Sequence, residues 1–168
     1  MHNNQQKYCL DTNFFIEAWN KYYSPDFCKS YWDVIDNLAK NGVVFITQEV
    51  KKEIDRGDDN LKEWLKNKSY IVKPIDQKVQ LCLRDLYTKN KTHQYLANNT
   101  KNRSIADPWV IAHAMAENAV VVTKEYLANS PNTQKIKIPD VCQNMNVRWI
   151  NDFDFIKEVN IIFNCETE

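Results

Sequence analysis

Apolar residues occur in this sequence in two patterns, as short unbroken runs and as longer stretches with helical spacing. A short run that is apolar at nearly every position indicates a strand buried on both faces, as in a parallel sheet covered by helices. Four runs fit this pattern, at residues 7–10, 43–46, 119–122 and 147–150. Helical patterns separate them, so the sequence predicts a three-layer α/β/α fold with a central, mostly parallel sheet.

Capping residues predict where several helices start and stop. Ser24-Pro25-Asp26 has the signature of a serine cap followed by proline, which predicts a helix from there to Gly42, with Phe27 on its apolar stripe. Thr47 should cap a second helix that ends at Gly57. A last helix should follow the cap at residues 151–152.

The middle third of the chain is expected to add helices rather than strands. Apolar spacing predicts helices around residues 61–65 and 79–87, with an extended piece at residues 70–72 between them. Residues 88–103 are polar and basic without periodicity, which is typical of a mobile loop, and His93 is expected on the surface. Residues 126–140 are also expected to be irregular.

The stretch from Ser104 to Glu125 should form a helix and a strand in direct succession. Asp107 before Pro108 is typical of a helix cap followed by proline, and Asn118 should end the helix. Residues 108–118 would extend about 16 Å along a helix, and residues 119–123 would return about 16 Å in the opposite direction along a strand. Asp107 and Glu125 should therefore lie at the same edge of the sheet.

Composition limits the classes of function. With 168 residues and 43% hydrophobic side chains, the chain is expected to form one domain over residues 1–168. Its five scattered cysteines favour reduced thiols of a cytoplasmic protein over disulfides or a zinc site. No apolar run approaches the roughly 20 residues that span a bilayer, so no membrane association is expected. The only glycines are Gly42 and Gly57, which excludes P-loop and dinucleotide-binding turns.

The net charge of zero conceals three regions of opposite sign. Residues 1–60 carry an excess of −3, residues 61–103 of +7 and residues 104–168 of −4. A polyanion such as RNA needs a basic surface if it is to approach an acidic site. The residues we predict to contact nucleic acid are Lys89, Lys91, Lys101 and Arg103.

Four acids are expected to meet at one edge of the sheet. Asp11 follows the first strand, Glu53 lies on the helix after the second, Asp107 is at a helix start and Glu125 follows the next strand. Ligands of open α/β sheets bind outside the carboxyl ends of the strands. Crowded carboxylates repel one another, and a hard divalent cation removes that cost. Because no cysteine or histidine accompanies them, the pattern favours Mg²⁺ or Mn²⁺ and hydrolysis of phosphodiester bonds.

Alternatives to this assignment remain open at the level of sequence. Glu49 lies four residues before Glu53 on the same predicted helix face and competes with it as a metal ligand. The other three acids could instead be helix caps or a solvated loop acid. Asn13 and Thr123 are expected to hydrogen-bond the acids rather than to bind the metal directly.

Four motifs resemble those of PIN-domain nucleases and occur in the same order. They are Leu10-Asp11-Thr12-Asn13, Thr47 with Glu53-Ile54, Ala106-Asp107-Pro108-Trp109-Val110-Ile111-Ala112, and Val121-Val122-Thr123-Lys124-Glu125. The resemblance covers roughly residues 7–57 and 104–157. The fourth acid of the family is usually an aspartate, whereas this chain has Glu125, and its middle insert exceeds that of compact PIN toxins.

The resemblance implies a PIN-like fold, a Mg²⁺ or Mn²⁺ site and ribonuclease activity, commonly as the toxin of a toxin–antitoxin pair. Our leading hypothesis is therefore a metal-dependent endoribonuclease with RNA as substrate and an antitoxin protein as partner. An inhibitor would cover the acidic edge or the nearby aromatic segment, residues 14–23, which could equally be core or a homodimer face.

Two other hypotheses come from different classes of protein. A catalytically silent PIN-like module that binds RNA or a protein partner is the main alternative, because the fourth acid is altered. A phosphoacceptor receiver domain is disfavoured, because the sequence has no acidic pair after its first strand. Cleavage of RNA that depends on a metal would separate the leading hypothesis from the first alternative.

Overall fold

A five-stranded sheet forms the centre of the molecule. A computed structural model of the chain describes residues 5–57, 59–97, 104–130 and 132–164. The strands are β1 (Tyr8–Leu10), β2 (Val44–Thr47), β3 (Val72–Lys73), β4 (Val120–Val122) and β5 (Trp149–Ile150). Their order is β3-β2-β1-β4-β5, and each neighbouring pair is parallel. All carboxyl ends therefore lie at one edge, which confirms the predicted parallel sheet.

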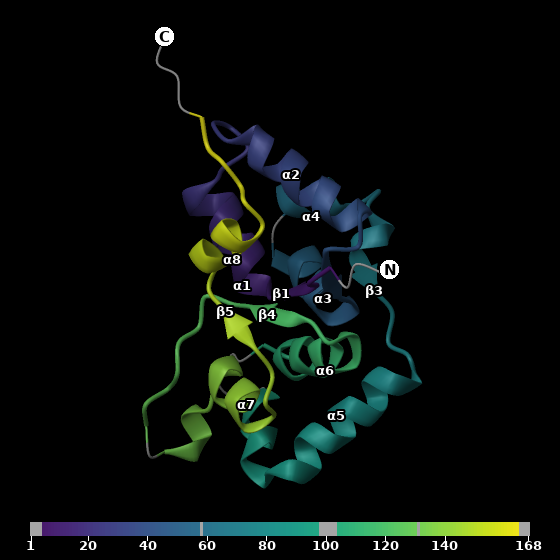
Figure 1. Cartoon of the computed structure of the whole chain (residues 1–168), viewed down its shortest axis with the longest axis vertical. Helices are drawn as coiled ribbons and strands as arrows, with labels where there is room; N and C mark the ends of the chain where they lie inside the picture. Colours follow the sequence, from purple (N-terminus) through teal and green to yellow (C-terminus); the bar gives the residue numbers. More distant parts are fainter. Residues whose placement is uncertain (1–4, 58, 98–103, 131, 165–168) are drawn as a thin grey trace.

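Helices cover both faces of this sheet, as Figure 1 shows. On one side lie α5 (Gln77–Lys89), α6 (Asp107–Glu117) and α7 (Ile138–Asn144). On the other side lie α1 (Thr12–Glu17), α2 (Lys29–Lys40), α3 (Gln48–Gly57), α4 (Asp59–Leu65) and α8 (Asp152–Glu158). A π-helical turn, Ala18–Tyr22, continues α1. This is the predicted three-layer α/β/α arrangement, with α4 and α5 as the extra helices of the middle third.

The central strands are apolar because both of their faces are buried. Cys9 of β1 pairs with Phe45 of β2 on one side and with Val121 of β4 on the other. Cys9 and Val121 are completely buried, and 1% of Phe45 is exposed. A strand that is covered on both sides gains hydrophobic stabilisation at every residue, which accounts for the unbroken apolar runs in the sequence.

Most predicted caps are confirmed. The Thr47 hydroxyl accepts a hydrogen bond of 3.1 Å from the Val50 backbone N–H at the start of α3. Asn151 caps α8 in the same way, by accepting from the Asp154 backbone N–H at 2.9 Å. Asn118 ends α6 in the left-handed conformation, with φ of 52°. Short polar side chains tolerate that conformation better than most residues.

The helix predicted to start at Ser24 begins later. The Ser24 carbonyl accepts from the backbone N–H groups of Phe27 and Cys28, so residues 24–28 form a turn, and α2 starts at Lys29. Phe27 was predicted to lie on the buried stripe, but 70% of it is exposed. The serine–proline signature therefore marks a turn that leads into the helix.

Residues 88–97 are more ordered than the loop that we predicted for residues 88–103, of which residues 98–103 lie outside the described ranges. Helix α5 extends to Lys89, and a 3₁₀ helix follows at Lys91–Ala97. His93, predicted to lie on the surface, is completely buried. Its Nδ1 lies 2.7 Å from the Leu86 carbonyl oxygen and its Nε2 lies 3.1 Å from Asn144 Nδ2. These polar contacts inside the protein stabilise a segment whose composition alone is typical of a loop.

Further corrections concern the predictions for residues 70–72 and 126–140. A 3₁₀ helix at Ser69–Ile71 takes the place of most of the extended piece, and only the short strand β3 follows it. Within the segment predicted to be irregular, a 3₁₀ helix forms at Thr133–Lys135, and α7 begins at Ile138. The Asp140 carboxylate caps α7 by accepting from the Lys137 backbone N–H at 2.9 Å.

The aromatic segment that follows β1 belongs mainly to the core. Phe14 and Phe15 are completely buried, and Phe14 packs edge-on against Phe155 of α8 with ring centroids 5.5 Å apart. Tyr22, by contrast, has 47% of its surface exposed. Only the far end of this segment can therefore meet another protein.

Two predictions from composition can be checked within the described ranges. The four cysteines found there, at positions 9, 28, 82 and 142, are free thiols, as predicted. In those same ranges every helix is too short or too polar to cross a lipid bilayer.

Candidate active site

Asp11 lies at the carboxyl end of the central strand β1. Its backbone N–H continues the sheet by donating to the Val122 carbonyl at 3.0 Å. Its Oδ1 accepts from the Thr12 backbone N–H at 2.7 Å, and its Oδ2 accepts from the Thr123 hydroxyl at 3.0 Å. Only 1% of the residue is exposed. Asp11 thus caps α1 and also lies at the meeting point of β1 and β4.

The sequence predicts Asp107 as the cap that precedes a helix. In the structure Asp107 is instead the first residue of α6. The residue before it, Ala106, is the cap position, and Pro108 follows in the first turn. Asp107 is 8% exposed. Because the cap position is Ala106, no side chain makes a capping hydrogen bond at the start of α6. The Asp107 carboxylate is therefore not used as a helix cap.

Glu53 joins three segments of the chain through hydrogen bonds. Its Oε2 accepts from the Thr12 hydroxyl at 2.7 Å, next to Asp11. Its Oε1 accepts from the Ser104 hydroxyl at 2.6 Å and from the Ala106 backbone N–H at 3.1 Å, next to Asp107. The carboxylate of α3 therefore lies between the two buried aspartates.

Glu125 follows β4 and is held by backbone contacts. Its backbone N–H donates to the Thr123 hydroxyl at 3.2 Å. Its Oε2 accepts from the Ile138 backbone N–H, at the start of α7, at 2.9 Å. Thr123 thus contacts both Asp11 and Glu125, in agreement with its predicted role as a hydrogen-bonding partner of the acids.

Burial and neighbouring charges change the protonation of the two buried aspartates. Burial, together with the charges of Glu125 and Glu53, raises the pKa of Asp11 from 3.8 to about 7, against the hydrogen bonds from Thr123 and Thr12. Burial likewise raises the pKa of Asp107 well above its usual value, with added repulsion from Asp11, Glu125 and Glu53. Desolvation and like charges both disfavour the ionised form. The charges of Glu53 and Glu125 thus act on both buried aspartates, although burial is the larger cause of the raised pKa values.

The acids do not yet form a compact set of ligands. Within the described ranges, no group of three or more acidic, histidine or cysteine side chains lies close enough together to hold a metal ion. Glu53 and Glu125 are turned toward protein donors, as described above. The donor chemistry of the cluster nevertheless suits Mg²⁺ or Mn²⁺, because all four side chains offer carboxylate oxygens. A cation would also offset the burial and the repulsion that together raise the pKa values of Asp11 and Asp107.

The other residues predicted from sequence have different positions. Asn13 is exposed, and its role stays a prediction. Lys89 and Lys91 are exposed, at the end of α5 and the start of the following 3₁₀ helix. Lys101 and Arg103 lie outside the described residues.

Two hydroxyl groups at the site were not predicted from the sequence. Thr12 and Ser104 hold the two oxygens of Glu53, at 2.7 and 2.6 Å. Both lie within three residues of a predicted acid, which is the only signal that the sequence offers. Their hydrogen bonds connect residues 41 and 51 positions apart, so helical or strand periodicity gives no indication of them.

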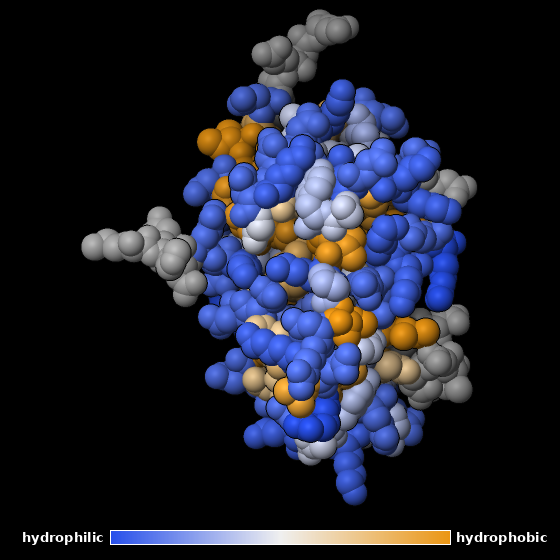
Figure 2. Space-filling view, turned by 90° about the vertical axis from the view of Figure 1, so that its right-hand side faces the viewer, coloured by the Kyte–Doolittle hydropathy of each residue, from blue (hydrophilic) through white to orange (hydrophobic). Residues whose placement is uncertain are grey.

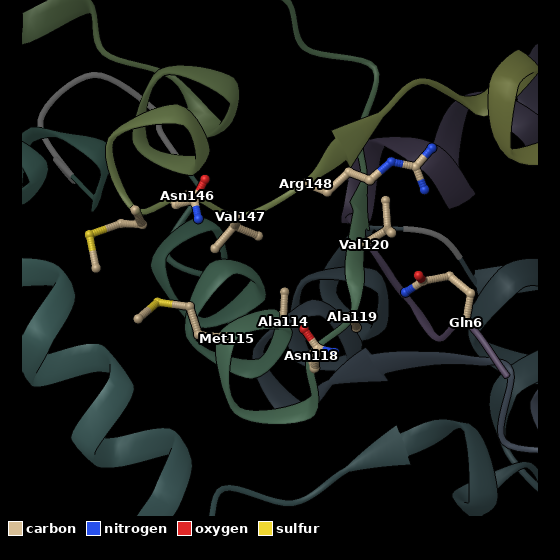
Figure 3. A pocket seen from close by; sticks show the side chains of 10 residues that line it. Gln6, Ala114, Met115, Asn118, Ala119, Val120, Asn146, Val147 and Arg148 are labelled. Atoms are coloured by element: carbon tan, nitrogen blue, oxygen red, sulfur yellow. The ribbon is translucent and has the colours of Figure 1, made fainter. Parts of the chain in front are cut away.

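A pocket at the opposite edge of the sheet is unrelated to the acids. It has a volume of about 390 Å³, and Figure 3 shows Val120 and Arg148 in its wall, where β4 begins and just before β5. Gln6, before β1, also lines it. The amino ends of the strands surround this pocket, whereas the acids lie at the carboxyl ends.

Comparison with known families identifies the chain. Residues 8–163 match the family described as domain of unknown function DUF4411. The chain belongs to the DUF4411 family. This DUF4411 protein is 29% identical over 124 residues to ribonuclease VapC2 of Rickettsia felis, with 69% of this chain and 84% of the relative aligned.

Solved structures share the fold of the DUF4411 protein. One is VapBC2 of Rickettsia felis bound to a DNA fragment from its promoter, with 22% identity and a TM-score of 0.53. Others are VapBC-1 of nontypeable Haemophilus influenzae, with a TM-score of 0.53, and FitAcB of Neisseria gonorrhoeae, with a TM-score of 0.52, both at 16% identity. Each alignment covers 87% of this chain and 98% of the other. The predicted resemblance to PIN-like nucleases is confirmed.

Proposed function

We propose that this protein is a metal-dependent endoribonuclease that serves as the toxin of a toxin–antitoxin pair. The observation that carries the proposal is the position of four acids at the carboxyl edge of the sheet. Asp11 and Asp107 are buried there, Glu53 is hydrogen-bonded to the residue next to each of them, and Thr123 contacts both Asp11 and Glu125. A parallel sheet places its ligand site at this edge. The likeness to a protein named ribonuclease VapC2 supports the same reaction.

The four carboxylates would hold one or two Mg²⁺ or Mn²⁺ ions. Such an ion supplies a more acidic water and charge stabilisation for phosphodiester hydrolysis when it is bound. Asp11 and Asp107 are the most buried of the four acids, with 1% and 8% exposed, and would form the inner part of the site. Thr123 orients Asp11, while Thr12 and Ser104 orient Glu53 through the bonds described above.

RNA is the proposed substrate, and the basic residues of the middle third are its proposed contacts. Lys89 and Lys91 are exposed and therefore able to meet a phosphate backbone. An acidic site repels a polyanion unless cations lie nearby, so these residues would supply attraction that depends on salt concentration.

An antitoxin is the proposed protein partner. The curated relative is named VapC2, whereas the solved structures of similar fold are of VapBC2, VapBC-1 and FitAcB, which supports a second protein as partner here. Expression of the wild type in a host without the native locus should arrest growth, whereas Asp11→Asn, produced at the same level, should not. Equal growth of both strains would contradict the role as a toxin.

The test of the enzymatic proposal is a cleavage assay on purified protein. Single-stranded and structured RNAs are incubated with the wild type and with Asp107→Asn, in Mn²⁺, in Mg²⁺ and in EDTA. We expect the wild type to cut RNA only in the presence of metal and the variant to lose at least a hundredfold in rate. Undiminished cleavage by Asp107→Asn, or cleavage in EDTA, would refute the assignment.

One observation favours a second candidate, a catalytically silent module that binds RNA or a protein. Glu53 and Glu125 both accept hydrogen bonds from protein donors, which would compete with a metal for their oxygens. If RNA binds but is not cut under any metal condition in the same assay, this second function is the correct one.

A further inference from the structure

Two buried polar atoms near the acids, Glu49 Oε2 and His113 Nε2, have no hydrogen-bond partner within the described part of the chain. Glu49 is 9% exposed and His113 is 1% exposed. Lys52 Nζ donates to the other oxygen of Glu49, Oε1, at 3.1 Å. Hydrophilic side chains cover most of the face drawn in Figure 2, where they meet solvent, whereas these two atoms are sealed from it. A buried polar atom without a protein partner is costly, and it commonly marks the place of a bound water molecule.

The two residues lie on the helices that carry two of the acids. Glu49 is one turn before Glu53 on α3, and His113 follows Asp107 on α6. Helices α3 and α6 cover opposite faces of the sheet, and both of them contact strand β2. The position of Glu53 relative to Asp107 therefore depends on how α3 and α6 meet at the carboxyl end of β2.

Several observations place Glu49 and His113 in the same region. Glu49 and Trp109 line one cavity of about 180 Å³ between α3 and the start of α6, and Trp109 is one turn before His113. The His113 ring lies beside Phe45 of β2, with ring centroids 6.4 Å apart. Phe45 is followed two residues later by Thr47, which caps α3. Among the neighbouring charges, that of Glu49 has the largest effect on the pKa of His113. A carboxylate oxygen and an imidazole nitrogen thus lie within reach of each other's charge, and neither has a partner.

His113 is expected to be neutral at pH 7. Burial lowers the pKa of its imidazole, and the charge of Lys73 acts in the same direction. Glu49, Asp76 and Glu117 act in the opposite direction, but the pKa stays below its usual value. A neutral imidazole carries one N–H, whereas the carboxylate of Glu49 offers only acceptors. The Nε2–H form of His113 therefore supplies a donor to a region in which Glu49 Oε2 lacks one.

We propose that one water molecule buried between α3 and α6 accepts a hydrogen bond from His113 Nε2–H and donates one to Glu49 Oε2. A water molecule satisfies both atoms at once, because it can accept one hydrogen bond and donate another. Glu49 and His113 are then positioning residues, which act through the helices that carry Glu53 and Asp107. The bridge fixes the separation of these two acids and so tunes the affinity of the site for a divalent metal. This role rests on the proposed metal-dependent function, whereas the bridge itself does not.

The first experiment compares two amides in place of the imidazole. The side-chain N–H₂ of His113→Gln lies close to the position of Nε2 and can keep the bridge, whereas that of His113→Asn is one bond shorter and cannot. We expect His113→Asn to weaken Mn²⁺ binding about tenfold in calorimetry, and His113→Gln to stay within about threefold of the wild type. Both variants bury a neutral amide, so their comparison separates the bridge from the loss of the ring. Equal affinities of the two variants would overturn the positioning role, whereas no binding by the wild type would refute the proposed function.

The second experiment tests the bridge without metal or cleavage. Side-chain ¹H–¹⁵N NMR of the metal-free wild type at pH 7 reports which imidazole nitrogen of His113 carries the proton, and His113→Gln serves to assign the signal. We expect the Nε2–H form, and a crystal structure should show a water molecule about 3 Å from both His113 Nε2 and Glu49 Oε2. Glu49→Leu, which keeps an apolar side chain of similar size, should lose this water. A proton on Nδ1, a charged ring at pH 7, or no water between the two atoms would overturn the proposal.

Discussion

Replacing Asp11 by asparagine should stabilise the metal-free protein at neutral and alkaline pH. Asp11 has its pKa raised from 3.8 in a free carboxyl to about 7 in the fold. A raised pKa means that the fold favours the protonated acid, so its contribution to stability is complete below about pH 4 and is lost as the pH rises to 7. The amide of asparagine keeps the shape of the carboxyl, carries no charge and can still accept from the Thr12 backbone N–H.

The size of this effect can be worked out from the shift. Three units of pKa correspond to about 4 kcal/mol of unfolding free energy at pH 8, and to less than about 1 kcal/mol at pH 4. The neutral amide accepts hydrogen bonds from Thr12 and Thr123 more weakly than the charged carboxylate does, which offsets part of this gain. We therefore expect the unfolding free energy of Asp11→Asn to exceed that of the wild type by about 2 kcal/mol at pH 8. In a protein of this size that is a rise in Tm of roughly 4–8 °C.

The assay is thermal or urea unfolding in EDTA between pH 4 and pH 8. Asp152→Asn is the matched control, since Asp152 is also buried, with 4% exposed, but lies 2.7 Å from Lys124 Nζ. Removing that partner should destabilise the protein by on the order of 1–3 kcal/mol. If Asp11→Asn were destabilised at pH 8, or if its advantage did not grow between pH 4 and pH 8, the repulsion among the acids would be refuted.

Two further predictions concern the surroundings of the acids. Thr123→Val removes the hydroxyl that donates to Asp11, so the pKa of Asp11 should rise further and the acid limb of the kcat/KM profile should move to higher pH; an unchanged profile would show that this bond has no catalytic role. Reversal of the predicted RNA-binding cations to glutamate should weaken RNA binding and flatten its dependence on salt, as measured by fluorescence anisotropy, whereas unchanged affinity at low salt would leave them as a solvated surface. The residues to be reversed are Lys89, Lys91, Lys101 and Arg103.

Local patterns predicted the parallel sheet well and placed the residues that follow its strands at one edge. The runs around β1 and β4 are apolar at every buried position, and a parallel sheet brings the residues that follow them to one edge. Asp11, Thr123 and Glu125 could therefore be brought together from strand ends alone. The matching lengths of α6 and β4 placed Asp107 at the same edge, because the strand returns the chain to the edge at which the helix begins.

Contacts between distant segments account for what the sequence did not predict. His93 is buried because the Leu86 carbonyl and Asn144, which is 51 residues away, complete its hydrogen bonds. In the same way, Thr12 and Ser104 donate to the carboxylate of Glu53, which belongs to a different segment of the chain. Periodicity describes one element at a time, so it cannot show which side chains of separate elements meet.

The central claim is that the four carboxylates form a site for a divalent metal, and equilibrium binding of Mn²⁺ tests it most directly. Isothermal titration calorimetry of the metal-free protein at pH 7.5 should show saturable binding with release of protons, because Asp11 and Asp107 both have raised pKa values and must be deprotonated to bind. Asp107→Asn should weaken this binding at least tenfold, while Asp152→Asn should not. Equal affinity of the wild type and Asp107→Asn for Mn²⁺, or no binding by either, would contradict the account.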